Sequence, residues 1–320
     1  MELKKVLLIG GSGFVGGWIA NRLSERGIRV TIPTRHRDNT KQLILLPTVY
    51  MVDADVHDPQ VLASLMTGVD AVINLVGILH DGDSSQPYGK RFAAAHVELP
   101  RKILAAMMQT GVRRLVHMSA LRASDDAPSA YLRSKAAGEA VVLGAARELD
   151  VTVFRPSVIF GPGDSFLNTF ASLLRVFPVM PLGGADARFQ PVYIGDVADA
   201  FCSCLTDRAT FGQTYELCGP TVYTLRELVE YTGELIGRRR PVIGLPDALA
   251  YLQAGFLSLL PNPPMSPDNL RSMQLDNLTD GRHNYPGWQP KSLEAVAPGY
   301  LSAVVRPNLR LDKYRCRAGR

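Results

Sequence analysis

The sequence predicts an α/β protein, with a doubly wound parallel sheet followed by a smaller, mostly helical lobe. Its first half alternates short apolar runs with helical patterns, which is the order of βαβ units. The predicted strands are continuously apolar, so we expect helices on both faces of the sheet. Beyond Gly161 this alternation weakens, and proline and glycine separate shorter elements. The 320 residues, 46% of them hydrophobic, are enough for both parts.

The elements of the first half follow from these patterns. We expect strands at 4–10, 28–35, 49–56, 70–78, 113–120 and 151–159, and helices at 17–27, 59–68, 92–110 and 129–149. This divides the chain into a nucleotide-binding domain at 1–160 and a smaller substrate or docking lobe at 161–320. Segments around 188–217 are expected to return to the main sheet.

Three glycines lie between the first predicted strand and the first predicted helix. Glycine accepts a positive φ and lets the backbone approach a ligand closely. At a strand-to-helix turn, the amides of the helix N-terminus then face an anion. A tight turn without a ligand is the alternative, but the strand before and the helix after favour a dinucleotide. The expected pyrophosphate cradle consists of Gly10, Ser12, Gly13, Phe14, Val15 and Gly16.

The end of the second predicted strand bears on the choice of dinucleotide. NAD-preferring proteins place an acid there, whereas an arginine accommodates the 2′-phosphate of NADP. This chain has Arg35, His36 and Arg37, and no acid before Asp38. We therefore expect NADP(H) to be preferred, with NAD(H) as the alternative. Further cofactor contacts are expected from Asp55 and Val56 near the adenine and from Leu75, Val76 and Gly77 beside the adenosine.

Tyr131 and Lys135 lie four positions apart on a predicted helix and therefore share one face. A cation near a tyrosine stabilises its phenolate, so the pair could transfer a proton. Spacing alone would equally fit an exposed surface pair. The position of the helix, after a strand whose carboxyl end should open onto the cofactor crevice, favours the catalytic interpretation.

At these motifs the chain resembles the short-chain dehydrogenase/reductase superfamily, in its extended and atypical branches, which include the NAD-dependent epimerases and dehydratases. The matching stretches are "GGSGFVG", "DADV", "NLVG", "YLRSK", "FRPSVIFGPGD" and "RFQPVYIGDVADAF". The resemblance implies a Rossmann fold, with Tyr131 as the acid/base. It implies that Lys135 holds the nicotinamide ribose and lowers the tyrosine pKa, and that Pro156, Ser157 and Val158 lie against the nicotinamide.

One position departs from the family pattern. The family usually has a serine or threonine at the end of the fifth strand to bind the substrate oxygen. Ala120 occupies that place here, with Ser119 one position earlier. Ser119 is the candidate substitute, and loss of turnover is the alternative.

Longer stretches resemble one atypical branch, the NAD(P)-binding accessory subunit of respiratory complex I and its bacterial relatives. They include "HMSALRASDDAPSAYLRSKAAGEAVV" and "LLPNPPMSPDNLRSMQLDNL". Two functions remain open. One is an NADP(H)-dependent oxidoreductase, epimerase or dehydratase that acts on a hydroxyl or carbonyl of an unknown small molecule. The other is a non-catalytic, NADPH-holding accessory or assembly protein with a membrane-associated or respiratory-complex partner.

Net charge and cysteine spacing restrict the partners, metal sites and cellular location that we expect. A net charge of +5 calls for no nucleic-acid partner. The four cysteines show neither a disulfide framework nor metal-site spacing, so we expect no metal and a cytoplasmic location. No segment reaches the ~20 apolar residues of a transmembrane helix. The apolar segment 248–261 follows Arg238–Arg240 and is either a packed helix or a docking surface. If it docks, the alternative location of the protein is the inner face of the membrane.

Overall fold

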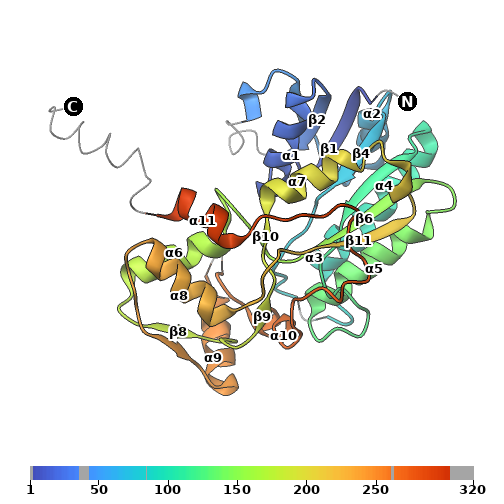
Figure 1. The fold of residues 1–320 in the computed structure, drawn as a ribbon. Helices are drawn as coiled ribbons and strands as arrows, with labels where there is room; N and C mark the ends of the chain where they lie inside the picture. Colours follow the sequence, from blue (N-terminus) through green and yellow to red (C-terminus); the bar gives the residue numbers. More distant parts are fainter. Residues whose placement is uncertain (1–2, 36–42, 84, 261–262, 303–320) are drawn as a thin grey trace, which may run out of the picture.

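The computed structural model describes residues 3–35, 43–83, 85–260 and 263–302 (Figure 1). Its centre is a seven-stranded sheet in the order β11-β6-β5-β4-β1-β2-β3, in which every pairing is parallel. The strands are β1 (Lys5–Ile9), β2 (Arg29–Thr34), β3 (Val49–Asp53), β4 (Ala71–Asn74), β5 (Arg114–Met118), β6 (Asp150–Pro156) and β11 (Gln213–Leu217). This arrangement confirms the predicted doubly wound α/β fold. The strand order reverses between β1 and β4, where such folds bind ligands.

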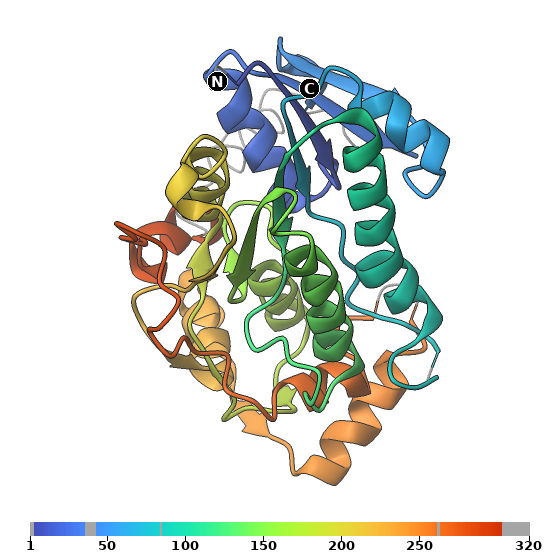
Figure 2. The same cartoon turned by 90° about the vertical axis from the view of Figure 1, so that its right-hand side faces the viewer.

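Helices cover both faces of the sheet, as the continuously apolar strands predict. One layer contains α1 (Phe14–Glu25) and α7 (Ile194–Ser203), and the other contains α2 (Pro59–Met66), α4 (Leu99–Thr110) and α5 (Ala130–Gly144). Figure 2 shows α1 and α7 on one side of the strands and α4 on the other. Successive residues of β1 pack against opposite layers, because side chains alternate along a strand. Val6 and Leu8 belong to the α1 and α7 core, and Leu7 and Ile9 to the α2, α4 and α5 core.

A π-helical turn interrupts the helix that the sequence predicts at 92–110. The helical segment starts with α3 (Lys90–Phe92), continues through the turn η3 (Ala93–Glu98) and ends with α4. Pro100 stands near the start of α4 and has no N–H to donate to the carbonyl of His96. That carbonyl faces α5, where a Cβ on Gly138 would lie 1.9 Å from its oxygen. The turn therefore accommodates the proline and lets the two segments pack closely.

The second lobe builds its own core from helices and short strand pairs. Its helices are α6 (Phe166–Val176), α8 (Leu225–Leu235), α9 (Asp247–Leu257), α10 (Pro267–Ser272) and α11 (Leu293–Leu301). Its strands are β7 (Ile159–Phe160), β8 (Met180–Leu182), β9 (Arg188–Phe189), β10 (Val192–Tyr193), β12 (Tyr223–Thr224) and β13 (Val242–Gly244). Two single turns, η2 (Leu43–Leu45) and η4 (Arg208–Thr210), complete the described elements. In the described part of the chain, no helix combines the length and the apolar character needed to cross a bilayer.

Only part of the region around 188–217 joins the main sheet. β11 forms its edge and pairs with β6, with Gln213 opposite Thr152. The expectation for the earlier segment is wrong, because β9 pairs with β12 and β10 pairs with β7, each in a separate two-stranded sheet. Since β11 occupies the free edge of β6, no edge remains beside it for 188–193. Pro191, which lacks an N–H, also separates β9 from β10.

Candidate cofactor and active site

The glycine loop between β1 and α1 packs closely against neighbouring backbone. Gly10 has φ +81°, and a Cβ there would lie 3.0 Å from the amide nitrogen of Val76. A Cβ on Gly16 would lie 2.4 Å from the Cα of Gly11, so only glycine lets α1 approach the loop this closely. Gly13 precedes α1 and caps it with no side chain. The first turn of α1 thus has no side-chain cap and glycine backbone before it, which fits a phosphate-bearing ligand.

The other predicted cofactor residues lie at the carboxyl edge of the same sheet. Leu75, Val76 and Gly77 follow β4, and the Leu75 amide donates to the Ile9 carbonyl at 2.9 Å. Arg35 follows β2 and is exposed. Asp55 and Val56 follow β3, and the Asp55 carboxylate accepts from the His57 amide at 2.9 Å. Within the predicted cradle, Ser12 is exposed, whereas Phe14 and Val15 are half-buried. Arg37 lies outside the described residues.

Lys135 lies under the predicted nicotinamide end of the site. The side chain is 3% exposed, and its ammonium donates to the Met118 carbonyl at the end of β5, at 2.7 Å. A Cβ on Gly77 would be 3.8 Å from the same nitrogen. Burial lowers the pKa of Lys135 to about 8, against the opposing charge of Glu139. This position is suited to holding ribose hydroxyls.

Tyr131 sits in the first turn of α5, after the cap Ser129, whose hydroxyl accepts from the Leu132 amide at 3.2 Å. Burial raises the pKa of Tyr131 to about 12. The protein alone therefore keeps the phenol protonated at neutral pH. The resemblance implied that Lys135 lowers this pKa, whereas in the structure burial raises it.

His96 supports the turn that carries Tyr131 and was missed from the sequence. Its Nε2 accepts from the Ile78 amide at 3.0 Å. Its Nδ1 lies 2.7 Å from the Ser134 hydroxyl, which itself donates to the Tyr131 carbonyl at 2.7 Å. Burial and the nearby Lys135 lower the pKa of His96 to about 3, so the ring is neutral and carries its proton on Nδ1. No spacing pattern marks this residue, because the π-helical turn decides which way it faces.

Ser119 follows β5 and is 3% exposed. Its hydroxyl has no hydrogen-bond partner among the described residues. Such a group is costly to bury unless something else satisfies it. Ala120, at the place where a hydroxyl was expected, packs instead against Ala127, Leu132 and Tyr131. The structure thus leaves the Ser119 hydroxyl for a ligand oxygen to satisfy.

A cleft of about 2280 Å³ joins these residues to the second lobe. Ser119, Tyr131, Pro156, Ser157 and Val158 all border it. Gly77 borders it from the cofactor side, and α6, α9 and α10 form the opposite wall. Small-molecule sites usually enclose ~300–1,000 Å³, so this cleft has room for a second ligand besides the end of a cofactor.

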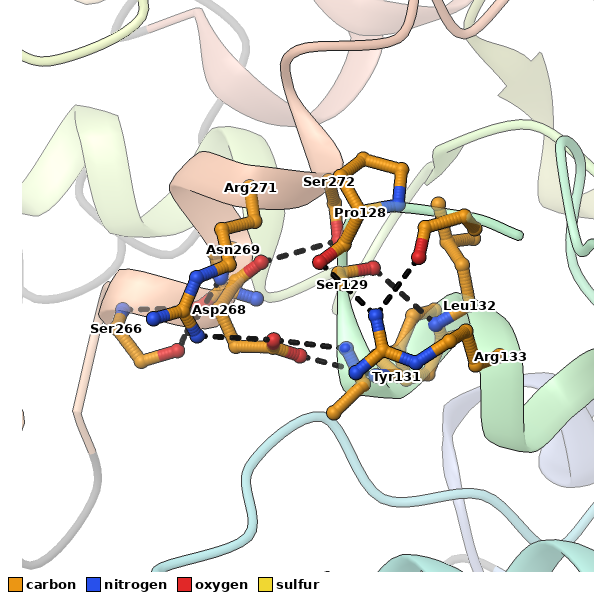
Figure 3. A network of polar contacts seen from close by, with 12 residues as sticks. Pro128, Ser129, Tyr131, Leu132, Arg133, Ser266, Asp268, Asn269, Arg271 and Ser272 are labelled. Atoms are coloured by element: carbon orange, nitrogen blue, oxygen red, sulfur yellow. Dashed lines mark hydrogen bonds and ion pairs between the residues drawn. The ribbon is translucent and has the colours of Figure 1, made fainter. Parts of the chain in front are cut away.

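The second lobe also reaches into the first turn of α5 (Figure 3). The Asp268 carboxylate, on α10, accepts from the Ala130 amide at 2.9 Å and from the Tyr131 amide at 3.0 Å. A capping box of Ser266 and Asn269 holds the start of α10. The motif "SPDN" predicts that cap, but nothing in the sequence shows that Asp268 meets α5. A residue 137 positions away thereby fixes the turn that carries the tyrosine.

The described residues contain no cluster of histidine, cysteine or carboxylate side chains that could hold a metal ion. Cys202, Cys204 and Cys218 are buried free thiols, and burial raises the pKa of each to about 12.

Comparison with known proteins gives one consistent family. Residues 6–218 match the NAD dependent epimerase/dehydratase family. The chain is 32% identical to NADH dehydrogenase (ubiquinone) 1 alpha subcomplex subunit 9, mitochondrial, from Arabidopsis thaliana, over 85% of this chain and 69% of that protein. It is 30% identical to the 40 kDa subunit of NADH-ubiquinone oxidoreductase from Neurospora crassa, over 85% of this chain and 71% of that protein. Among solved structures, the Bordetella bronchiseptica enzyme WbmF in complex with NAD+ matches with a TM-score of 0.66 and 22% identity, over 76% of this chain and 81% of that chain.

Proposed function

This chain belongs to the NAD dependent epimerase/dehydratase family, and from that premise we propose that it is an NADP(H)-dependent oxidoreductase, epimerase or dehydratase that acts on a hydroxyl or carbonyl group. One observation carries the proposal. Ser119, whose hydroxyl has no hydrogen-bond partner in the described part of the chain, and Tyr131 border the same cleft, and the buried Lys135 ammonium donates to the carbonyl of Met118, which also borders it.

Each residue of the site has its own role in the proposed reaction. The nicotinamide supplies or removes a hydride when the cofactor is bound. Ser119 donates a hydrogen bond to the substrate oxygen. Tyr131 gives that oxygen a proton, or accepts one in the reverse direction. Its pKa of about 12 keeps the phenol protonated, so it is available as a proton donor. Lys135 holds the ribose, and His96 and Asp268 keep the first turn of α5 in place.

A Tyr131→Phe variant tests this function. The substitution removes the proton donor and little packing volume, so we expect carbonyl-dependent oxidation of NADPH to fall by a factor of about 100 or more. NADPH affinity should stay within a factor of about three. Tyr50→Phe, at an exposed position of β3, is the matched control and should behave as wild type. Equal activity of the two variants would exclude Tyr131 as the acid.

Arg35 supports the preference for NADP(H), because it is exposed at the carboxyl edge of the sheet next to β2. An Arg35→Ala variant should bind NADPH about tenfold more weakly or worse, with little change for NADH. Arg29, exposed at the opposite end of β2, provides the matched control. Equal losses for NADPH and NADH in Arg35→Ala would contradict the preference.

A second function, an NADPH-holding accessory subunit of a respiratory membrane assembly, is favoured by two observations. The two relatives compared above are, by name, subunits of an NADH dehydrogenase (ubiquinone) and of an NADH-ubiquinone oxidoreductase. In addition, the α9 region exposes Leu252 (70%), Phe256 (73%) and Leu259 (80%), as a surface covered by another protein subunit would. This function places the chain at the periphery of the membrane.

One co-purification experiment distinguishes the two functions. A tagged chain should co-purify with the respiratory NADH dehydrogenase from solubilised membranes, and Phe256→Asp should abolish this. Under the accessory function, Tyr131→Phe should leave the association and respiratory activity unchanged. Absence of the chain from that assembly would exclude the accessory function.

A further inference from the structure

We infer that the cleft takes an elongated, apolar substrate with a single oxygen-bearing end, a lipid-like ketone, aldehyde or alcohol. The inference rests on the proposed function, because it assigns a substrate class to the same site. In the reducing direction the carbonyl carbon receives the hydride of NADPH and the oxygen receives the Tyr131 proton, which produces an alcohol and NADP+.

The polar end of such a substrate has a defined place. Ser119 and Tyr131 both border the cleft, and the Ser119 hydroxyl is buried without a partner among the described residues. A single oxygen that accepts from the two hydroxyls would satisfy both. Nearby Ala120 and Leu132 are buried and apolar, so neither side chain offers a hydrogen bond to a second polar group.

The opposite wall of the cleft is apolar. It is formed by side chains of α6, β8 and the α9 region, among them Phe166, Phe170, Leu173, Met180, Leu257 and Leu260. The polar side chains between them bond to the protein itself. Thr169 donates to the Ser165 carbonyl, Gln253 to the Pro181 carbonyl and Ser258 to the Gly255 carbonyl. This wall therefore favours a hydrocarbon over a sugar, whose hydroxyls would lose their hydrogen bonds with water.

The charges of the cleft do not suit a diphosphate. Four arginines border it, Arg91, Arg122, Arg133 and Arg271, and so do four aspartates, Asp81, Asp83, Asp126 and Asp268. Most of these arginines are engaged within the protein. Arg122 donates to the Asp276 carbonyl, Arg133 donates to the Ala127 and Pro128 carbonyls, and Arg271 pairs with Asp268 at 3.6 Å. A nucleoside diphosphate sugar would find balanced charge where it needs an excess of cations.

Calorimetry on the NADPH-loaded protein tests the inference with 2-dodecanone, 2-butanone and UDP-glucose, each below its solubility limit. Each buried methylene contributes about 0.8 kcal/mol, so even partial burial of the longer chain should make 2-dodecanone bind at least 100-fold more tightly than 2-butanone. UDP-glucose should bind more weakly than 2-dodecanone. Affinity that is independent of chain length, or tighter binding of UDP-glucose, would overturn the inference.

Variants locate the apolar end. Leu173→Asp places a charge on the α6 wall. It should reduce the ratio of the affinities for 2-dodecanone and 2-butanone at least tenfold and leave the affinity for 2-butanone unchanged. Leu173→Ala, which is milder, should reduce the same preference if the aspartate variant fails to fold. Leu249→Asp, which is exposed on α9 and does not border the cleft, is the control and should leave both affinities unchanged. A preference that survives both Leu173 substitutions would refute the placement.

These measurements separate the inference from the proposed function. If 2-dodecanone binds and no carbonyl oxidises NADPH, the proposed function fails and the binding site stands. If a short hydrophilic carbonyl is reduced and 2-dodecanone does not bind, the function stands and the inference fails.

Discussion

Replacing Asp268 tests whether the second lobe holds the turn that carries Tyr131. Its carboxylate accepts from two first-turn amides of α5, at 2.9 and 3.0 Å, and the side chain is only 17% exposed. A hydrogen bond to a charged group contributes ~1.5–3 kcal/mol, but water in the cleft can satisfy these amides in part once the carboxylate is gone. We therefore expect Asp268→Ala to lower the free energy of unfolding by about 2 kcal/mol, comparable to the loss of a strong helix cap.

Urea unfolding of the cofactor-free protein measures this loss. Asp268→Asn keeps the size and one acceptor, so it should lose about half as much. Arg271→Ala is the control, because its 3.6 Å pair with Asp268 is half exposed and should contribute less than about 0.5 kcal/mol. If Asp268→Ala were as stable as Arg271→Ala, the carboxylate would not hold α5, and the reasoning from these contacts would be refuted.

Two further predictions concern the cofactor end. Gly16→Ala should weaken NADPH binding at least tenfold in calorimetry, because its Cβ would lie 2.4 Å from the Gly11 Cα. Gly17→Ala is the control, because its Cβ would meet only an ordinary contact at 3.9 Å. This control should bind NADPH normally and gain up to about 1 kcal/mol of stability. The second prediction follows from Lys135, whose folded pKa of about 8 lies below its ordinary value of 10.5. The unfolded chain then binds more protons between pH 8 and 10.5, so this residue should make the folded state more stable as pH rises through that window, by about 3 kcal/mol in total. Urea unfolding at several pH values should show that rise in the wild type and not in Lys135→Met; parallel curves would contradict it.

The sequence was informative wherever one short segment carries the whole signal. The apolar runs of β1, β4 and β5 predict a parallel sheet, because strands buried on both faces need apolar residues at every position. Gly16 predicts close backbone approach because its constraint, the nearby Gly11, lies within the same turn. Whether the assigned residues bind the cofactor or react stays a prediction that the experiments above address.

Contacts between distant segments could not be predicted in this way. The pairing of β9 with β12 was missed because two-residue strands have no periodicity of their own. His96 reaches the turn of Tyr131 only because a π-helical turn beside Pro100 rotates it there. Asp268 looks like an ordinary first-turn acid of a short helix until α10 is seen against α5.

Residue order alone therefore predicted the parallel sheet, the glycine loop and the tyrosine and lysine on one helical face, since the pattern that indicates each of them lies within a short segment of the chain. Tertiary structure alone decided the environment of those groups. It buries Lys135 and Tyr131, leaves the Ser119 hydroxyl without a partner among the described residues and lays the apolar wall of α6 and α9 across the cleft. Burial and desolvation arise from surfaces that meet only after folding, and no local pattern encodes them.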